Sequence, residues 1–393
     1  MAKQSTKQNS SSFTKTHNVY FVIGEVSGDT LGVELLDGFK ACGANVNPMG
    51  LGGTKMQARG LNSTIDVSDI AVMGLANVVA KLPKLLKLAR KVADDIVAKE
   101  PDVIVLIDSP EFAKQIAKRV KKKLPNTPII KYVCPSVWAW REHRAKKMTA
   151  YIDHILAILP FEPELLKKLE GPSATYVGHP LARLAGKVKA SSKKKPNTKP
   201  NVLLMPGSRQ GELARMFPVL KQTVELLEER GNDLNYIIPA VSHLKENIEQ
   251  EIATRPHSIS KRVKIIEGEK AKLKAFEKAD LAIATSGTAI LELAMHMIPC
   301  ISIYKLDKAL NAIRFIIKAW TAALPNLIAD KIIVPERINE YAHPQYIARL
   351  AEGLLVEGHE RNAQLKGFEL VHKNMSQKQD PASIAAKAIL KFL

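Results

Sequence analysis

The chain alternates between short apolar runs and segments in which apolar residues recur at helical spacing. In the first half, four runs have the length and composition of buried strands: Val19–Ile23, Val103–Ile107, Ile129–Val133 and Ile155–Leu159. Three segments between them have the pattern of a helix with one apolar face: Thr30–Lys40, Lys84–Lys99 and Glu111–Lys123. This alternation predicts a parallel sheet with helices on both faces.

The alternation stops at 187–201, where Lys, Ser, Pro and Asn leave almost nothing to bury and indicate a linker. It restarts with five strand-like runs: Val202–Met205, Tyr236–Pro239, Val263–Ile266, Leu281–Ala284 and Cys300–Ile303. Helical patterns accompany them at Gly211–Glu229, Lys270–Lys278 and Thr288–Met297, and the region from Pro344 to Leu393 looks wholly helical.

These patterns predict two Rossmann-like domains, 19–186 and 202–343, with a cleft between them and C-terminal helices over 344–393. Whether those helices pack back on the first domain stays open. Residues 1–18 lack an apolar segment, so we interpret them as a disordered tail and not as a secretory signal. Open α/β sheets bind ligands beyond the carboxyl ends of their strands, so chemistry is expected in the loops that follow them.

Composition narrows the class of protein. With 393 residues, 46% of them apolar and 25% charged, the chain is too long for one ordinary core and too apolar for global disorder. Its three cysteines lie far apart and have no zinc spacing, so a reducing cytoplasm is expected. No apolar run approaches the roughly 18 residues of a membrane-spanning helix.

The net charge of +19 is uneven along the chain. Residues 1–200 hold 32 Lys and Arg against 17 Asp and Glu, a balance of +15, whereas the rest holds 26 against 22, a balance of +4. The excess in the first half indicates an anionic partner, which is a nucleic acid, a membrane surface or a phosphorylated substrate.

The first strand runs into a turn that contains Gly24, Glu25, Ser27, Gly28 and Asp29. Its spacing is not the GxGxxG of dinucleotide sites, which makes that reading weak. A tight strand-to-helix turn and a loop that contacts a sugar both fit these residue types.

Asp108 directly follows the strand Val103–Ile107, where a carboxylate could accept a proton from an attacking hydroxyl. It could equally cap the helix that Pro110 and Glu111 begin. The next strand ends in a loop with Trp138, Trp140 and Arg141. These aromatics either stack on a sugar or base or simply pack the loop.

Residues 72–99 combine an apolar stripe with a basic rim. The stripe residues recur at helical spacing, which first of all indicates a core-facing surface. Basic residues flank them, and apolar residues precede them, as a membrane-interface segment requires. The candidate interface residues are Val72, Met73, Leu75, Val79, Lys81, Lys84, Lys87, Arg90 and Lys91.

Two loops of the second half suit an anion. Gly207, Ser208 and Arg209 follow a strand and precede a helix, which suits a phosphate, although a solvated arginine is the alternative. Ser286, Gly287 and Thr288 repeat this arrangement before a second helix, whose first amides and dipole would face a pyrophosphate. Glu292, about one turn further, could accept both ribose hydroxyls, or it is a solvated residue of a capping turn. No DxD, HExxH or carboxylate cluster indicates a metal.

Taken together, these residues resemble the lipid-A-disaccharide synthase family, inverting glycosyltransferases of the GT-B fold. The matching stretches follow the family's order over about residues 19–335: Gly24–Asp29, Ala71–Gly74, Ile107–Pro110, Ser136–Arg141, Leu159–Glu162, Val177–Pro180, Pro206–Arg209, Ser286–Ala289 and Leu324–Leu327. Two features depart from the pattern. Glu111-Phe112-Ala113 stands where the family has Asp-Phe-Asn, which puts one acceptor contact in doubt, and the N-terminal tail is additional.

The resemblance implies transfer of 2,3-diacylglucosamine from UDP-2,3-diacylglucosamine to 2,3-diacylglucosamine 1-phosphate, without a cofactor. Asp108 would be the base, and the loops with Gly24, Glu25, Ser27, Gly28, Asp29, Trp138, Trp140 and Arg141 would contact the acceptor. Nucleotide-binding residues would be Arg209, Ser286, Gly287, Thr288, Glu292 and Asn326. The basic first half would then face anionic lipid, on the inner face of the inner membrane of a Gram-negative bacterium.

Two other interpretations of the sequence compete with this assignment. Another GT-B enzyme, such as an N-acetylglucosaminyltransferase or a UDP-sugar epimerase, would have a similar second-half site, but the first-half loops argue against it. A nucleic-acid-binding protein would explain the charge, yet no helix-turn-helix, RRM, KH or zinc pattern is present. Nothing in the sequence specifies an oligomeric state.

Overall fold

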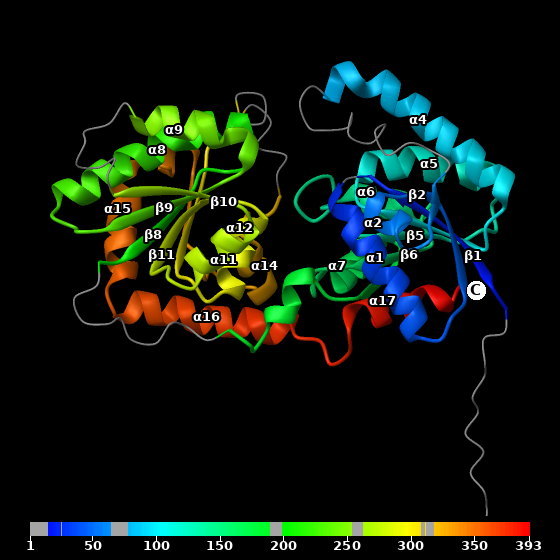
Figure 1. Cartoon of the computed structure of the whole chain (residues 1–393). Coiled ribbons are helices and arrows are strands. Elements are labelled where there is room, and N and C mark those ends of the chain that lie inside the picture. Colours follow the sequence, from blue (N-terminus) through cyan, green and yellow to red (C-terminus); the bar gives the residue numbers. More distant parts are fainter. Residues whose placement is uncertain are drawn as a thin grey trace, which may run out of the picture. The chain divides into compact units, whose positions relative to one another are not determined.

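Two parallel sheets organise the chain (Figure 1). The computed structural model describes residues 15–24, 26–63, 78–188, 199–253, 262–307, 311 and 318–393. It divides into two compact units, one formed by Met1–Gly178 with Gln377–Leu393 and the other by His179–Ser376.

The first unit contains a seven-stranded sheet of order β3-β2-β1-β4-β5-β6-β7, in which every pairing is parallel. The strands are β1 (His17–Ile23), β2 (Val46–Leu51), β3 (Asn62–Ser63), β4 (Val103–Ile107), β5 (Ile129–Tyr132), β6 (His154–Ala157) and β7 (Ser173–Tyr176). The helices are α1 (Val26–Ala41), α2 (Thr54–Gln57), α4 (Val78–Lys99), α5 (Pro110–Lys123), α6 (His143–Met148), α7 (Glu162–Lys168) and α17 (Pro381–Leu390).

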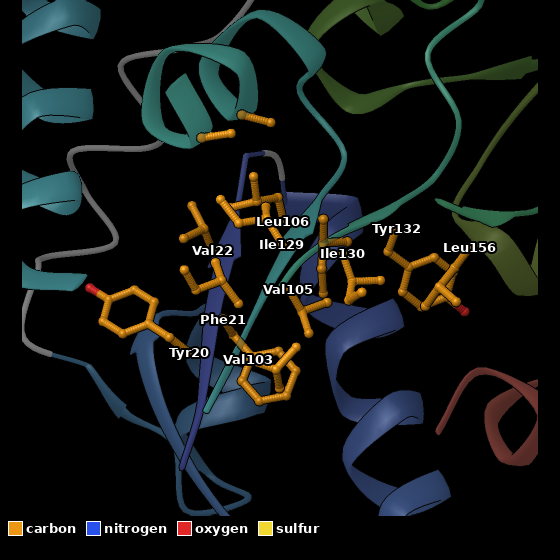
Figure 2. Close-up of a cluster of buried hydrophobic side chains, with 14 of the residues drawn as sticks. Tyr20, Phe21, Val22, Val103, Val105, Leu106, Ile129, Ile130, Tyr132 and Leu156 are labelled. Carbon is orange, nitrogen blue, oxygen red and sulfur yellow. The ribbon is translucent and has the colours of Figure 1, made fainter. Parts of the chain in front are cut away.

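The middle strands of this sheet are apolar on both faces because helices cover both. Every residue of β4 is buried, and β1 is buried at all positions except one. Figure 2 shows side chains of β1, β4 and β5, among them Phe21, Val105 and Ile130, within one apolar cluster. Continuous Val and Ile runs of this kind are typical of parallel strands with helices on either side.

The last helix, α17, belongs to the first unit and packs against α1. Its Ala385, Ala386 and Ile389 are fully buried in the cluster of that unit. A Cβ on Gly38 of α1 would lie 2.3 Å from the carbonyl oxygen of Ala382, so the glycine permits the close approach of the two helices. The C-terminus is therefore part of the core of the first unit.

The second unit contains a six-stranded parallel sheet of order β10-β9-β8-β11-β12-β13. The strands are β8 (Asn201–Met205), β9 (Asn235–Ala240), β10 (Val263–Glu267), β11 (Leu281–Thr285), β12 (Cys300–Tyr304) and β13 (Glu336–Ile338). The helices are η1 (Pro180–Leu184), α8 (Gln210–Glu229), η2 (Ser242–Leu244), α9 (Lys245–Ala253), α11 (Glu269–Phe276), α12 (Thr288–Met295), α14 (Leu324–Ala329), η4 (Asn339–Tyr341), α15 (Pro344–Leu355) and α16 (His359–Met375).

The expected pair of Rossmann-like parallel sheets and the helical C-terminus are confirmed. The short edge strands β3, β7 and β13 were not predicted from the sequence. The structure divides the chain after Gly178, whereas the first domain was predicted from the sequence to end at residue 186. Among the C-terminal helices, α17 lies in the first unit. Most of the expected tail and linker, residues 1–14 and 189–198, lies outside the described residues.

Candidate functional site

Three neighbouring strands of the first unit, β1, β4 and β5, end at the same edge of their sheet. The turn after β1 packs directly on the turn after β4. Gly24 donates its N–H to the carbonyl of Ile107 (3.1 Å), and a Cβ on Gly24 would lie only 2.0 Å from the Cβ of Ser109. The glycine is therefore required by this close packing.

Asp108 leaves β4 in an unusual backbone conformation. Its φ is +58° and that of Ser109 is +41°, a left-handed pair that costs free energy for residues other than glycine. The Asp108 carboxylate is half-buried and accepts the Ser109 N–H at 2.9 Å. The N-cap residue of α5 is Ser109, so the capping role considered for Asp108 is wrong.

A buried lysine on the neighbouring strand donates hydrogen bonds to the backbone of this turn. Lys131, on β5, is 2% exposed, and its Nζ donates to the carbonyl oxygens of Asp108 (2.6 Å) and Tyr132 (3.0 Å). Such charge-assisted hydrogen bonds are stronger than neutral ones. Lys131 was not predicted from the sequence, although a single charge inside an apolar strand was a signal.

The tryptophan loop lies between β5 and α6. The Trp138 ring meets Phe161 edge to face with centroids 5.6 Å apart, and the Arg141 guanidinium lies 4.3 Å from the Trp140 ring centroid. Both tryptophans are partly exposed, so each retains surface for a ligand. Packing of the loop is therefore confirmed, whereas stacking of these rings on a sugar or base stays a prediction.

Glu162 lies beneath this loop and is 2% exposed. Burial raises the pKa of its carboxyl to about 7, against the opposing effects of the Leu159 N–H and the Trp138 indole. The Leu159 N–H donates to it at 3.0 Å. This residue falls in a motif noted in the sequence, but no role was predicted for it.

Asp29 has a different role from the predicted acceptor contact. It is 5% exposed, and its oxygens accept the N–H groups of Gly53 (3.0 Å), Lys55 (2.9 Å) and Met56 (3.1 Å). The carboxylate therefore anchors the start of α2. Gly28 packs beside Ile107. Glu25 and the side chain of Ser27 lie outside the described residues.

The second unit holds a cavity of about 930 Å³. Its lining comes from the carboxyl ends of β8, β9, β10 and β11 and from the starts of α8, α11 and α12. Five predicted nucleotide-binding residues line it together: Arg209, Ser286, Gly287, Thr288 and Glu292. Residues from two separate loops thus meet at the edge where parallel sheets bind ligands.

The start of α12 is open to this cavity. Gly287 has a φ of +146°, and apart from its neighbours along the chain no atom of the described residues lies within 4 Å of the position of a Cβ there. The Ser286 N–H already bonds to the carbonyl of Ile303 (3.0 Å), so the expectation that it serves a phosphate is wrong. The amides that begin the helix, from Gly287 onward, are the anion-binding groups that remain.

The start of α8 is already occupied by a carboxylate of the chain. One oxygen of Glu212 accepts the N–H groups of Ser208 (3.1 Å) and Arg209 (3.3 Å), and the other pairs with the Arg209 guanidinium at 2.9 Å. The expectation that these amides bind a phosphate is therefore wrong, because Glu212 already accepts their hydrogen bonds. The Arg209 side chain is 58% exposed and borders the cavity.

Two further lining residues were missed from the sequence. Lys272, on α11, has its Nζ 2.8 Å from Glu292 and 3.0 Å from Glu269. The Thr285 hydroxyl is buried and has no hydrogen-bond partner among the described residues. No local pattern links Lys272 to Glu292, because the two residues come from different helices.

Asn326 does not line this cavity. It is 1% exposed, its Nδ2 donates to the Val334 carbonyl (3.0 Å), and its Oδ1 accepts the N–H groups of Ile333 and Val334 (2.8 Å each). Its amide holds the chain between α14 and β13, so the predicted nucleotide contact gives way to a structural role.

Helix α4 carries the basic rim. Lys84, Lys87, Arg90 and Lys91 are exposed, while Ala89, Val92, Ala93 and Ile96 are buried in the core. The C-terminal part of the stripe therefore faces the core, as its spacing first indicated. Val72, Met73 and Leu75 lie outside the described residues, as do the side chains of Val79 and Lys81. In the described part of the chain, no helix has the length and apolar character needed to cross a membrane.

The paired Rossmann-like units define a GT-B protein, and solved structures agree. MurG from Acinetobacter baumannii aligns with a TM-score of 0.58 at 13% identity, over 95% of this chain and 99% of that one. A UDP-GlcNAc 2-epimerase from Methanocaldococcus jannaschii, in complex with UDP-GlcNAc and UDP, aligns with a TM-score of 0.57 at 13% identity, over 95% and 99%. At this identity the likeness shows the fold alone.

Sequence comparison identifies the family within that class. The lipid-A-disaccharide synthetase family model matches residues 19–390. The lipid-A-disaccharide synthase of Nitrobacter winogradskyi is 34% identical over 384 residues, and that of Rhodopseudomonas palustris is 35% identical over 382, each covering 96% of both chains. The chain belongs to the lipid-A-disaccharide synthase family and is a glycosyltransferase of lipid A biosynthesis.

Proposed function

We propose that this chain transfers 2,3-diacylglucosamine from UDP-2,3-diacylglucosamine to 2,3-diacylglucosamine 1-phosphate, releasing UDP. Family membership supports the reaction. The cavity of the second unit is the observation that supports the donor assignment, because its volume of about 930 Å³ lies within the usual range for small-molecule sites. One structural neighbour, the epimerase from Methanocaldococcus jannaschii, was crystallised in complex with UDP-GlcNAc and UDP.

In this proposal the diphosphate lies at the start of α12. The amides of Gly287 and Thr288 and the positive end of the helix dipole would meet its charge, with Arg209 at the border of the cavity. Glu292 would accept the two ribose hydroxyls. Its position one turn inside the helix separates this carboxylate from the anion by about 6 Å along the axis.

Asp108 is the proposed base. It would take the proton from the 6-hydroxyl of the acceptor as that oxygen attacks the anomeric carbon of the donor. UDP would leave from the opposite face, which inverts the configuration, and its growing charge would be stabilised by the α12 amides and Arg209. Holding both substrates in the reacting geometry would supply further acceleration.

The finer location and partners are also part of the proposal. The acceptor carries a phosphate and acyl chains, so we infer that α4 approaches an anionic membrane surface, on the inner face of the inner membrane. The exposed Lys84, Lys87, Arg90 and Lys91 would attract lipid headgroups.

The test is product analysis after the pure protein is mixed with both acylated substrates. We expect lipid A disaccharide 1-phosphate and one UDP for each disaccharide. Equal transfer from unacylated UDP-GlcNAc would instead favour another GT-B activity. For the donor site, Arg209→Ala combined with Glu292→Ala should weaken UDP binding, and an unchanged UDP affinity would overturn that assignment.

A further inference from the structure

The proposed donor cavity has more carboxylates than cations in its lining. Glu212, Glu269 and Glu292 face two cations, Arg209 and Lys272, so the formal balance is two minus three, or −1. A diphosphate adds further negative charge. Binding therefore depends on how these carboxylates are compensated, and this question goes beyond the proposed UDP site while resting on it.

The pairs in the cavity differ in their surroundings. Arg209 and Glu212 form one pair, but the Arg209 side chain is 58% exposed, so it can turn toward a ligand. Lys272 is held more firmly, with 22% of its side chain exposed and its Nζ 2.8 Å from Glu292 and 3.0 Å from Glu269. Its ammonium also lies 5.7 Å from the ring centroid of Phe276.

Lys272 remains charged in this position. Burial lowers the pKa of Lys272, but the hydrogen bonds to Glu292 and Glu269 and the negative charges of these two carboxylates together raise it by more, so the net shift is upward. Glu292 is 18% exposed, whereas Glu269 is 67% exposed and is largely screened by solvent. Glu292 is thus the carboxylate for which the loss of Lys272 matters most.

We infer that Lys272 is a positioning residue for the sugar-nucleotide donor. It fixes the Glu292 carboxylate for the ribose and cancels its charge, which allows a diphosphate to bind one helical turn away at the start of α12. Without Lys272, a half-buried carboxylate would stand uncompensated beside the diphosphate. Repulsion at this separation, in the dielectric of a protein surface, weakens binding by on the order of tenfold to a hundredfold.

The test compares UDP and uridine binding to wild type, Lys272→Met, Lys272→Arg and the control Lys274→Met. Lys274 is an exposed cation on the same helix and does not line the cavity. We expect Lys272→Met to weaken UDP binding at least about tenfold and uridine binding much less, because uridine carries no phosphate. Lys272→Arg should restore most of the UDP affinity, and Lys274→Met should leave it unchanged.

One further measurement separates charge compensation from a merely structural role. Adding Glu292→Gln to Lys272→Met should recover UDP affinity, since it removes the uncompensated charge.

The possible failures are distinguishable. If wild type binds no UDP, the proposed donor site is wrong and this inference falls with it. If wild type binds UDP and Lys272→Met binds it within about twofold, the pair is an ordinary surface ion pair and the inference alone is overturned. Equal losses for UDP and uridine, without recovery by Glu292→Gln, would also overturn it.

Discussion

The ammonium of Lys131 lies 2.6 Å from the main-chain carbonyl oxygen of Asp108, so a residue buried in the sheet holds the residue proposed as the base. In Lys131→Met, the carbonyl oxygens of Asp108 and Tyr132 would lose this hydrogen-bond donor. We expect about 2–4 kcal/mol of lost stability, together with a turnover at least about tenfold lower. Thermal unfolding and UDP release would measure both effects, and Lys122→Met, an exposed lysine on α5, should change neither. A fully active Lys131→Met protein would contradict the proposed link.

Asp108→Ala and Asp108→Asn should abolish most activity without unfolding the protein. A positioned general base contributes about 10²–10⁴-fold, so we expect UDP release to fall by that factor in both variants. Asn tolerates the left-handed backbone of Asp108, so the melting temperature of Asp108→Asn should stay close to that of wild type. Near-normal turnover in both variants would remove Asp108 as the base.

Gly24→Ala should distort the Asp108 turn through a single methyl group. The added Cβ would lie 2.0 Å from the Cβ of Ser109, so one turn must move, at about 1–3 kcal/mol of stability and with reduced turnover. Ser109→Gly removes the opposing Cβ, so the double variant should recover much of both. Gly358→Ala, which meets open space, is the control. If the double variant recovers nothing, this contact is not the cause.

Glu162→Gln should make stability less dependent on pH. Burial raises the pKa of Glu162 in the folded protein to about 7 from its ordinary value of 4.5, so the folded state binds this proton more tightly than the unfolded chain does. The stabilisation that comes from this tighter proton binding is complete below pH 4.5 and is lost as the pH rises through 7. Relative to wild type, Glu162→Gln should gain at most about 3 kcal/mol between pH 5 and pH 8.

Denaturant unfolding at several pH values would measure this gain. The exposed Glu164→Gln, on the same helix, should run parallel to wild type. Parallel curves for Glu162→Gln as well would show that the carboxyl is ionised in the folded protein at neutral pH.

Neutralising the α4 cations should weaken binding to anionic vesicles. Replacement of Lys81, Lys84, Lys87, Arg90 and Lys91 by Gln removes attraction worth about 1 kcal/mol for each cation near the surface. Sedimentation at low and high salt would measure the change. A matched variant should replace exposed lysines outside α4: Lys122, Lys123, Lys147, Lys167 and Lys168. If both variants lose vesicle binding equally, the attraction comes from the overall positive charge of the protein and not from the cations of α4.

The central strands were predictable because burial on both faces leaves a continuous apolar run, as in Val103–Ile107. The edge strand Asn62–Ser63 is too short and too polar to produce such a signal. The Asp108 turn and the start of α12 could be found because strand ends are local features. The contacts of Lys131 and Lys272 could not, since they join separate elements. Asp29 and Asn326 bind backbone groups of their own units, and the sequence could not distinguish such contacts from contacts with a ligand.

The placement of α17 in the core of the first unit has a consequence for biosynthesis. The segment that completes this core, around Ala385 and Ile389, is synthesised after the second unit, which is one continuous stretch of the chain. We therefore expect the middle of the chain to fold first, while the β1–α1 region waits with an apolar surface exposed. A nascent chain that stops before α17 would leave the core of the first unit incomplete.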